Sequence, residues 1–247
     1  MAAHQAGERV IFAAPTPSEL QVLMKPHRNS LKEAATTFFE VMEAFGRLGE
    51  HPVTATIRDG PQPFTQFTHY PQDDVDDIQT GYAWYYHAHA PSRERPWSEH
   101  GHFHCYAYTE NVPADVKPVA LPRHPDPVAG GLIHLIALCM NEAGVPYRLF
   151  TLNRWASDEW LFPAQTVVNL AKAFHLENPR HQLTSRWLGV MLRLLQPQIE
   201  WLVAARDRRI FPNYPDLSPN FSESPELEIT STLTFDLDEH LAAVERL

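Results

Sequence analysis

The sequence predicts an α+β fold in which a mainly antiparallel sheet, carrying a histidine-rich hairpin, is flanked by N-terminal and C-terminal helices. Three observations support this class. Apolar residues recur at helical spacing over residues 31–47, short alternating segments fill about 52–155, and helical spacing returns over about 162–209. With 44% hydrophobic and 20% charged residues, the composition is that of a globular protein. We therefore expect residues 1–247 to form one domain.

The first predicted helix covers about residues 31–47. Ser30 and Glu33 form an S-x-x-E capping-box pattern at its start, and Gly49 follows its last apolar residue. Residues 1–29 are polar and contain prolines, so we expect irregular structure there.

Two short strands are expected next, at 53–57 and 64–70, with a turn at 60–61 between them. The acidic run 73–77 lacks the spacing and central glycine of an EF-hand, so we interpret it as a solvated loop. The later elements are read from the same periodicities and breaker residues. They are a hairpin of 132–140 and 147–153, a helix from Pro163 to about 177, one long helix or a helix pair over 183–202 with Pro197 as a kink or a restart, a loop at 211–225, a strand at 227–235 and a helix at 238–246 capped by Asp236.

Five histidines within a short segment are the main functional signal. His87 and His89 lie two apart in one predicted strand, 81–89, and His100, His102 and His104 lie two apart in the next, 100–108. Residues two apart on a strand point to the same face. Paired as a hairpin, the two strands would direct these imidazoles into one volume, where they could together bind a transition-metal ion. The alternative is a strip of His and Tyr facing solvent.

Neighbouring residues extend the predicted site. Glu99 is a candidate oxygen ligand, a group that orients an imidazole, or a general base. Tyr85 and Tyr106 share the histidine face, where their hydroxyls suit redox chemistry or hydrogen bonding. His134 lies alone in an apolar strand and could complete the site if that strand neighbours the hairpin, although a hydrogen-bonded core histidine is the simpler reading. His69 is a weaker candidate.

The two cysteines are expected to pack in the core. By strand parity Cys105 points away from the histidine face, and Cys139 lies opposite His134. Gly101 leaves room for a metal or a neighbouring strand to approach closely.

Residues 81–101 resemble the first cupin signature, G-x5-HxH-x4-E-x6-G. That resemblance implies a small β-barrel, with His87, His89 and Glu94 as metal ligands and oxygenase or isomerase chemistry; the second cupin signature is absent. The block YYHAH…EHGHFH, followed by His134 and Asn153-Arg154-Trp155, looks like an uncharacterised bacterial family of unknown function. That second resemblance spans about 65–165 and implies no activity.

Charge and composition limit the partners. The net charge of −10 argues against nucleic acid or an anionic membrane, because both attract basic surfaces. Two cysteines give no disulfide framework, and the N-terminus lacks the pattern of a secretory signal, so we expect a cytoplasmic protein. A homodimer is compatible with this composition.

The favoured hypothesis is a metal-dependent enzyme that acts on a small molecule at a mononuclear site. A nitrogen-rich ligand set favours a non-haem iron or copper oxidoreductase, with zinc or nickel as other metals. A zinc-dependent hydrolase and a non-catalytic protein that stores, carries or senses metal remain as alternatives.

Overall fold

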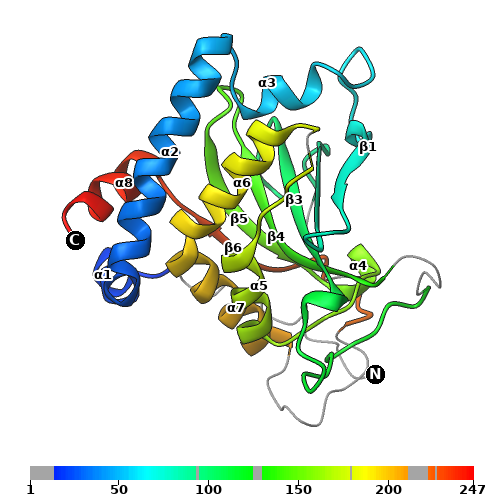
Figure 1. Cartoon of the computed structure of the whole chain (residues 1–247). Helices are drawn as coiled ribbons and strands as arrows, with labels where there is room; N and C mark the ends of the chain where they lie inside the picture. The colour runs from blue at the N-terminus through cyan, green and yellow to red at the C-terminus, as the bar shows by residue number, and fades with distance from the viewer. Residues whose placement is uncertain (1–13, 93–94, 125–129, 179, 211–221, 226) are drawn as a thin grey trace.

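Six strands form one antiparallel sheet whose spatial order is the order of the sequence (Figure 1). The strands are β1 (Tyr70–Asp77), β2 (Tyr82–His87), β3 (Gly101–Tyr108), β4 (Leu132–Met140), β5 (Pro146–Leu152) and β6 (Ile229–Thr234). The computed structural model describes residues 14–92, 95–124, 130–178, 180–210, 222–225 and 227–247. With β1 and β6 at its two edges the sheet is open, so the barrel implied by the cupin resemblance is wrong.

Helices precede β1, lie between β5 and β6 and follow β6, which confirms the predicted α+β class. The helices are α1 (Pro17–Met24), α2 (Arg28–Leu48), α3 (Pro52–Ile57), α4 (Arg154–Ser157), α5 (Ala164–Ala173), α6 (Gln182–Leu194), α7 (Gln196–Ile210) and α8 (Leu237–Glu245), with 3-10 turns η1 (Lys25–His27) and η2 (Thr109–Asn111). In Figure 1 α6 lies across one face of the sheet, with α2 outside it. Over the described ranges, no helix combines the length and the apolar character needed to cross a bilayer.

The main core lies between the sheet and these helices. Alternate residues of β2 and β3, such as Trp84 and Phe103, are fully buried in it together with Trp187 of α6. Trp84 Nε1 donates a hydrogen bond of 2.9 Å to Ser185 Oγ, so the large indole is also satisfied as a donor. Because side chains alternate along a strand, the intervening residues face the opposite side.

The strand prediction was wrong in the segment before β2. Residues 53–57 belong to helix α3, where Pro52 occupies the first helical turn, a position that proline favours. Residues 64–70 form no strand until Tyr70. The acidic run, predicted as a solvated loop, is most of β1, an edge strand with Tyr70, Val75 and Asp77 buried. Asp77 is stable there because its carboxylate accepts four backbone N–H groups.

The prediction of irregular structure for residues 1–29 was also partly wrong. Thr16 and Glu19 form a capping box at the start of α1. The sequence analysis predicted neither this helix nor its cap. A 3-10 turn leads directly into α2, so Ser30 lies inside the helix and donates to the carbonyl of His27 instead of capping it. Residues 1–13 and 211–221 lie outside the described residues.

The remaining elements agree with their predictions to within a few residues. Strand β4 matches at both ends, and Pro197 lies in the first turn of α7, as expected for a helix that restarts. Asp236 caps α8 by accepting from the N–H of Glu239 at 2.9 Å.

Candidate metal centre

Four imidazoles meet on the face of the sheet that the main helical layer leaves uncovered. In the β2–β3 pairing His87 lies opposite His102 and Tyr85 lies opposite His104, so alternation brings these side chains to the same face. His89 follows just after β2 and turns back over the same face, where its ring is parallel to that of His102 at 5.4 Å. This is the convergence that the spacing of the histidines predicted.

The distances between ring nitrogens match those of neighbouring metal ligands. His87 Nε2 lies 3.0 Å from His104 Nε2 and 3.1 Å from His89 Nε2. One nitrogen each of His87, His89 and His102 also lies within 4.8 Å of the others. Two nitrogens bound at about 2.1 Å are about 3.0 Å apart at a right angle and about 3.4 Å apart at the tetrahedral angle. His87, His89 and His102 therefore form a group that can bind one transition-metal ion, and His104 Nε2 lies beside His87 Nε2 as a further candidate ligand.

Two of the rings, those of His102 and His104, are oriented by contacts to the ring nitrogen that faces away from the cluster. His102 Nδ1 is 2.7 Å from Glu99 Oε1, and Trp97 Nε1 donates to the other carboxylate oxygen at 3.2 Å. His104 Nδ1 is 2.9 Å from His134 Nε2. Each contact occupies the outer ring nitrogen and leaves Nε2 for the centre, which is how metal-binding histidines are usually oriented.

Burial keeps the imidazoles of His87, His89 and His104 neutral, as metal ligands must be. Removal from water, together with neighbouring imidazoles, lowers the pKa of His89 to about 4 and the pKa values of His87 and His104 well below the usual range. Burial opposes ionisation of Glu99, but hydrogen bonding and charge interaction with His102 outweigh it and lower the pKa of Glu99 to about 2. The carboxylate is therefore charged at neutral pH.

Hydrogen bonds alone satisfy this cluster poorly. A neutral imidazole nitrogen carries either one N–H or one lone pair, so His87 Nε2 cannot make good bonds to both of its close neighbours. His89 Nδ1 is buried without a hydrogen-bond partner. A bound cation would satisfy the converging lone pairs, which favours a metal over a solvent-facing histidine strip.

His100, predicted as a ligand, lies on the other side of the sheet. Its Nδ1 contacts the Tyr86 hydroxyl at 2.6 Å, and its ring stacks on Phe64 with centroids 5.0 Å apart. Strand β3 begins only at Gly101, so His100 sits in the preceding bend, where strand alternation does not apply. The space that Gly101 leaves is filled by Tyr86 and the His87 carbonyl, in line with the predicted close approach of a neighbouring strand.

A bulge in β4 explains why His134 and Cys139 share a face. Tyr106 pairs with His134 but Cys105 pairs with Ile136, so Leu135 is the extra residue and the alternation shifts by one. Cys139 therefore packs beside Phe150 on the histidine side, and the prediction that it points away from His134 is wrong. Cys105 lies in the main core, as predicted.

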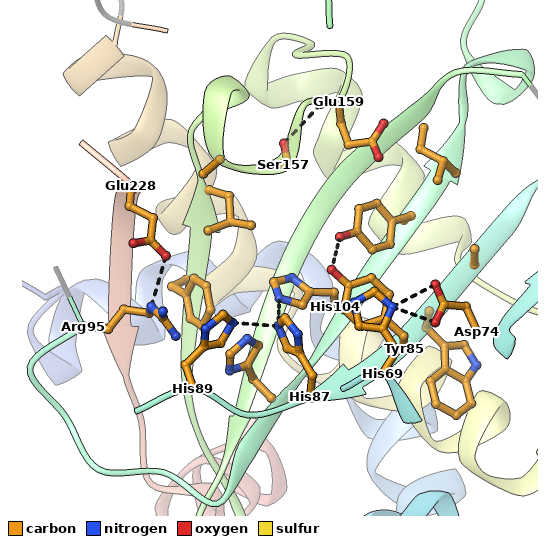
Figure 2. A pocket seen from close by; sticks show the side chains of 18 residues that line it. His69, Asp74, Tyr85, His87, His89, Arg95, His104, Ser157, Glu159 and Glu228 are labelled. Carbon is orange, nitrogen blue, oxygen red and sulfur yellow. Dashed lines mark hydrogen bonds and ion pairs between the residues drawn. The ribbon is translucent and has the colours of Figure 1, made fainter. Parts of the chain in front are cut away.

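A cavity of about 360 Å³ opens over the histidines (Figure 2). The hydroxyls of Tyr85 and Tyr106 are 2.9 Å apart in its wall, and burial raises the pKa of Tyr85 to about 12, so both stay protonated. Two polar pairs also line the cavity, His69 with Asp74 and Arg95 with Glu228. His69 was the weaker candidate of the sequence analysis, and the other three residues were not predicted.

Glu159 also lines the cavity, whereas Glu99 does not. No local pattern marks Glu159, which is brought to the wall by the turn after α4. Arg154, part of the block that carries the family resemblance, does not line the cavity and pairs with Asp158 and Glu223. The cupin-derived ligand Glu94 lies outside the described residues.

Comparison with known proteins gives a family without an activity. No curated protein and no solved structure matched the chain. The family model described as "Domain of unknown function (DUF6969)" matches residues 32–235, which include all of the histidine cluster. The match agrees with the resemblance to an uncharacterised family, and it extends far beyond the block that carried that resemblance. The chain belongs to this family of unknown function.

Proposed function

We propose that this protein is a metal-dependent enzyme that holds one transition-metal ion on His87, His89, His102 and His104. The observation that carries the proposal is the convergence of four imidazoles, three buried and one (His89) half-buried, two of which have their outer nitrogen occupied by a neighbouring side chain. Such a set is costly to bury without a common partner.

The ligand chemistry favours iron or copper and also suits zinc or nickel. The cluster offers only imidazole nitrogens. Cys139 is not proposed as a ligand, because burial and the nearby Glu99 carboxylate raise the pKa of its thiol well above the usual range, so it stays protonated.

The adjoining cavity favours an enzyme over a protein that only stores or senses metal. Its size suits a small organic molecule. An iron or copper ion would supply one-electron chemistry, and this is the reason for favouring an oxidoreductase. One hydroxyl of the Tyr85–Tyr106 pair donates its proton to the other. The second hydroxyl can therefore donate its own proton to a bound group. We propose Glu99 as a positioning residue, because its carboxylate serves His102 and Trp97.

A zinc-dependent hydrolase is the second candidate. The specific observation in its favour is Glu159, a carboxyl group in the cavity wall whose pKa burial raises to about 7, a suitable value for a general base. A zinc ion would lower the pKa of a bound water.

Metal analysis of protein purified without a polyhistidine tag tests the proposal. We expect about one transition-metal ion per chain, lost in His87→Ala and His102→Ala. His100→Ala is the matched control, because it removes an imidazole from the same segment but from the other face, and it should retain the ion. Absorption and electron paramagnetic resonance spectra distinguish iron and copper from zinc. Full metal content in the folded His87→Ala and His102→Ala variants, or none in the wild type after reconstitution, would refute the proposed centre.

A further inference from the structure

Glu159 lies in the wall of the cavity across from the histidines (Figure 2). Two backbone contacts fix its position: its own N–H donates to Ser157 Oγ at 3.3 Å, and the N–H of Trp160 donates to the Leu132 carbonyl at 2.9 Å. The carboxyl group is thus attached to the end of β4 by the next residue and is not on a free loop.

The Glu159 carboxyl group has spare hydrogen-bonding capacity. The backbone N–H of Leu132 is the one polar group that lowers its pKa, and no basic side chain among the described residues pairs with it. A carboxylate has two oxygens and about four acceptor positions, so one backbone donor leaves most of them open to the cavity.

The other charged groups of the cavity are already paired. His69 Nδ1 contacts Asp74 at 3.0 Å, and Arg95 pairs with Glu228 at 3.1 Å. Within the described lining, three carboxyl groups therefore accompany one guanidinium, and that guanidinium is matched. These carboxyl groups would repel the carboxylate of an organic acid or a phosphate group. They would stabilise a ligand group that donates a hydrogen bond.

Apart from Ser157 and the hydroxyl pair of Tyr85 and Tyr106, much of the remaining wall is apolar. Leu132, Leu152 and Phe150 line the cavity and suit a carbon skeleton rather than a highly charged molecule. The cavity thus has imidazoles on one side, the Glu159 carboxyl group on the other, and apolar side chains between them.

We infer that the cavity binds a small organic molecule that donates a hydroxyl or amino group to Glu159, and that it discriminates against carboxylate or phosphate groups at this position. The inference rests on the proposed function, because the other end of the molecule faces the metal centre.

Imidazole derivatives test the inference, because their ring binds the metal and a tail reaches into the cavity. With the cobalt-substituted protein, dissociation constants are measured from the visible spectrum for 4-methylimidazole, 4-(hydroxymethyl)imidazole, histamine and imidazole-4-acetate. At pH 8.5, where Glu159 is ionised, we expect the hydroxyl or amino tail to improve binding about tenfold over 4-methylimidazole, as expected for a hydrogen bond to a charged group. The acetate tail should weaken binding.

Glu159→Gln should abolish the advantage of the donor tail while leaving cobalt content unchanged. Glu142→Gln, at an exposed turn, is the matched control and should preserve the advantage. Equal or tighter binding of the acetate tail, or no gain from either donor tail, would overturn the inference while the metal centre stands. If Glu159→Gln does not fold, the tail series on the wild type decides alone. If cobalt or 4-methylimidazole does not bind at all, the proposed function has failed and the inference falls with it.

Discussion

Replacing Glu99 with Gln tests whether the centre depends on a charged support behind His102. The carboxylate contacts His102 Nδ1 at 2.7 Å, and the side chains of His102 and Glu99 are only 1% and 4% exposed. Gln can still accept the ring N–H through its amide oxygen. The substitution therefore removes the charge but can keep the geometry of the hydrogen bond.

The expected loss in metal affinity follows from this geometry. A hydrogen bond to a charged group contributes about 1.5–3 kcal/mol, and a neutral one about 0.5–1.5 kcal/mol. Exchanging one for the other costs about 1–2 kcal/mol, which corresponds to roughly a tenfold weaker dissociation constant. Support residues behind metal-binding histidines typically change affinity by about 10–100-fold, so Glu99→Ala, which also loses the hydrogen bond, should lie towards the upper end of that range.

Competition with a chelator of known affinity provides the assay, with zinc or cobalt as the metal and circular dichroism to verify folding. Glu142→Gln controls for the change in overall charge. Wild-type affinity in a folded Glu99→Gln protein would show that the buried carboxylate does not support the centre, and the proposed role of Glu99 would be wrong.

Two further predictions concern the metal-free protein and the hairpin. Burial lowers the pKa of His89 to about 4 and that of His134 to about 3, below the ordinary value of about 6.5, so the unfolded chain binds more protons in between. The free energy of unfolding should therefore fall as the pH drops from about 6.5 to 3; identical melting temperatures of the metal-free protein at pH 7.5 and 5 would contradict this. In Gly101→Ala the new Cβ would lie 2.6 Å from the His87 carbonyl oxygen, so urea unfolding should show a loss of about 1–3 kcal/mol; an unchanged midpoint would argue against the close approach.

Local periodicity predicted the part of the site that one hairpin builds. Spacing by two residues was enough to place His87, His102 and His104 together, because a regular strand leaves no other choice of face. The rule failed where the backbone departs from that regularity, at the bend of His100 and at the bulge that brings Cys139 to the histidine side. Neither departure has a distinctive local composition.

The opposite wall of the cavity could not be predicted, because it depends on tertiary packing. Asp74 comes from an edge strand that looked like a loop, and Glu159 comes from the turn after α4. Helix α3 shows the same limit for secondary structure. Its Val, Thr and Ile residues favour a strand, but a proline in the first helical turn and burial of Val53 against the core decide for a helix.

The proposed ligands lie close together in the sequence, which bears on how the protein assembles. His87 and His104 are 17 positions apart, and His89 and His102 lie between them. Closing so small a loop costs little chain entropy compared with joining distant segments. If the proposed centre binds its ion, chelation can therefore begin in a ribbon of two strands, before helix α6 docks on its reverse side. An ion bound at that stage would stabilise the hairpin before the rest of the protein folds. The supply of the ion during synthesis would then influence the yield of folded protein as well as the chemistry of the protein.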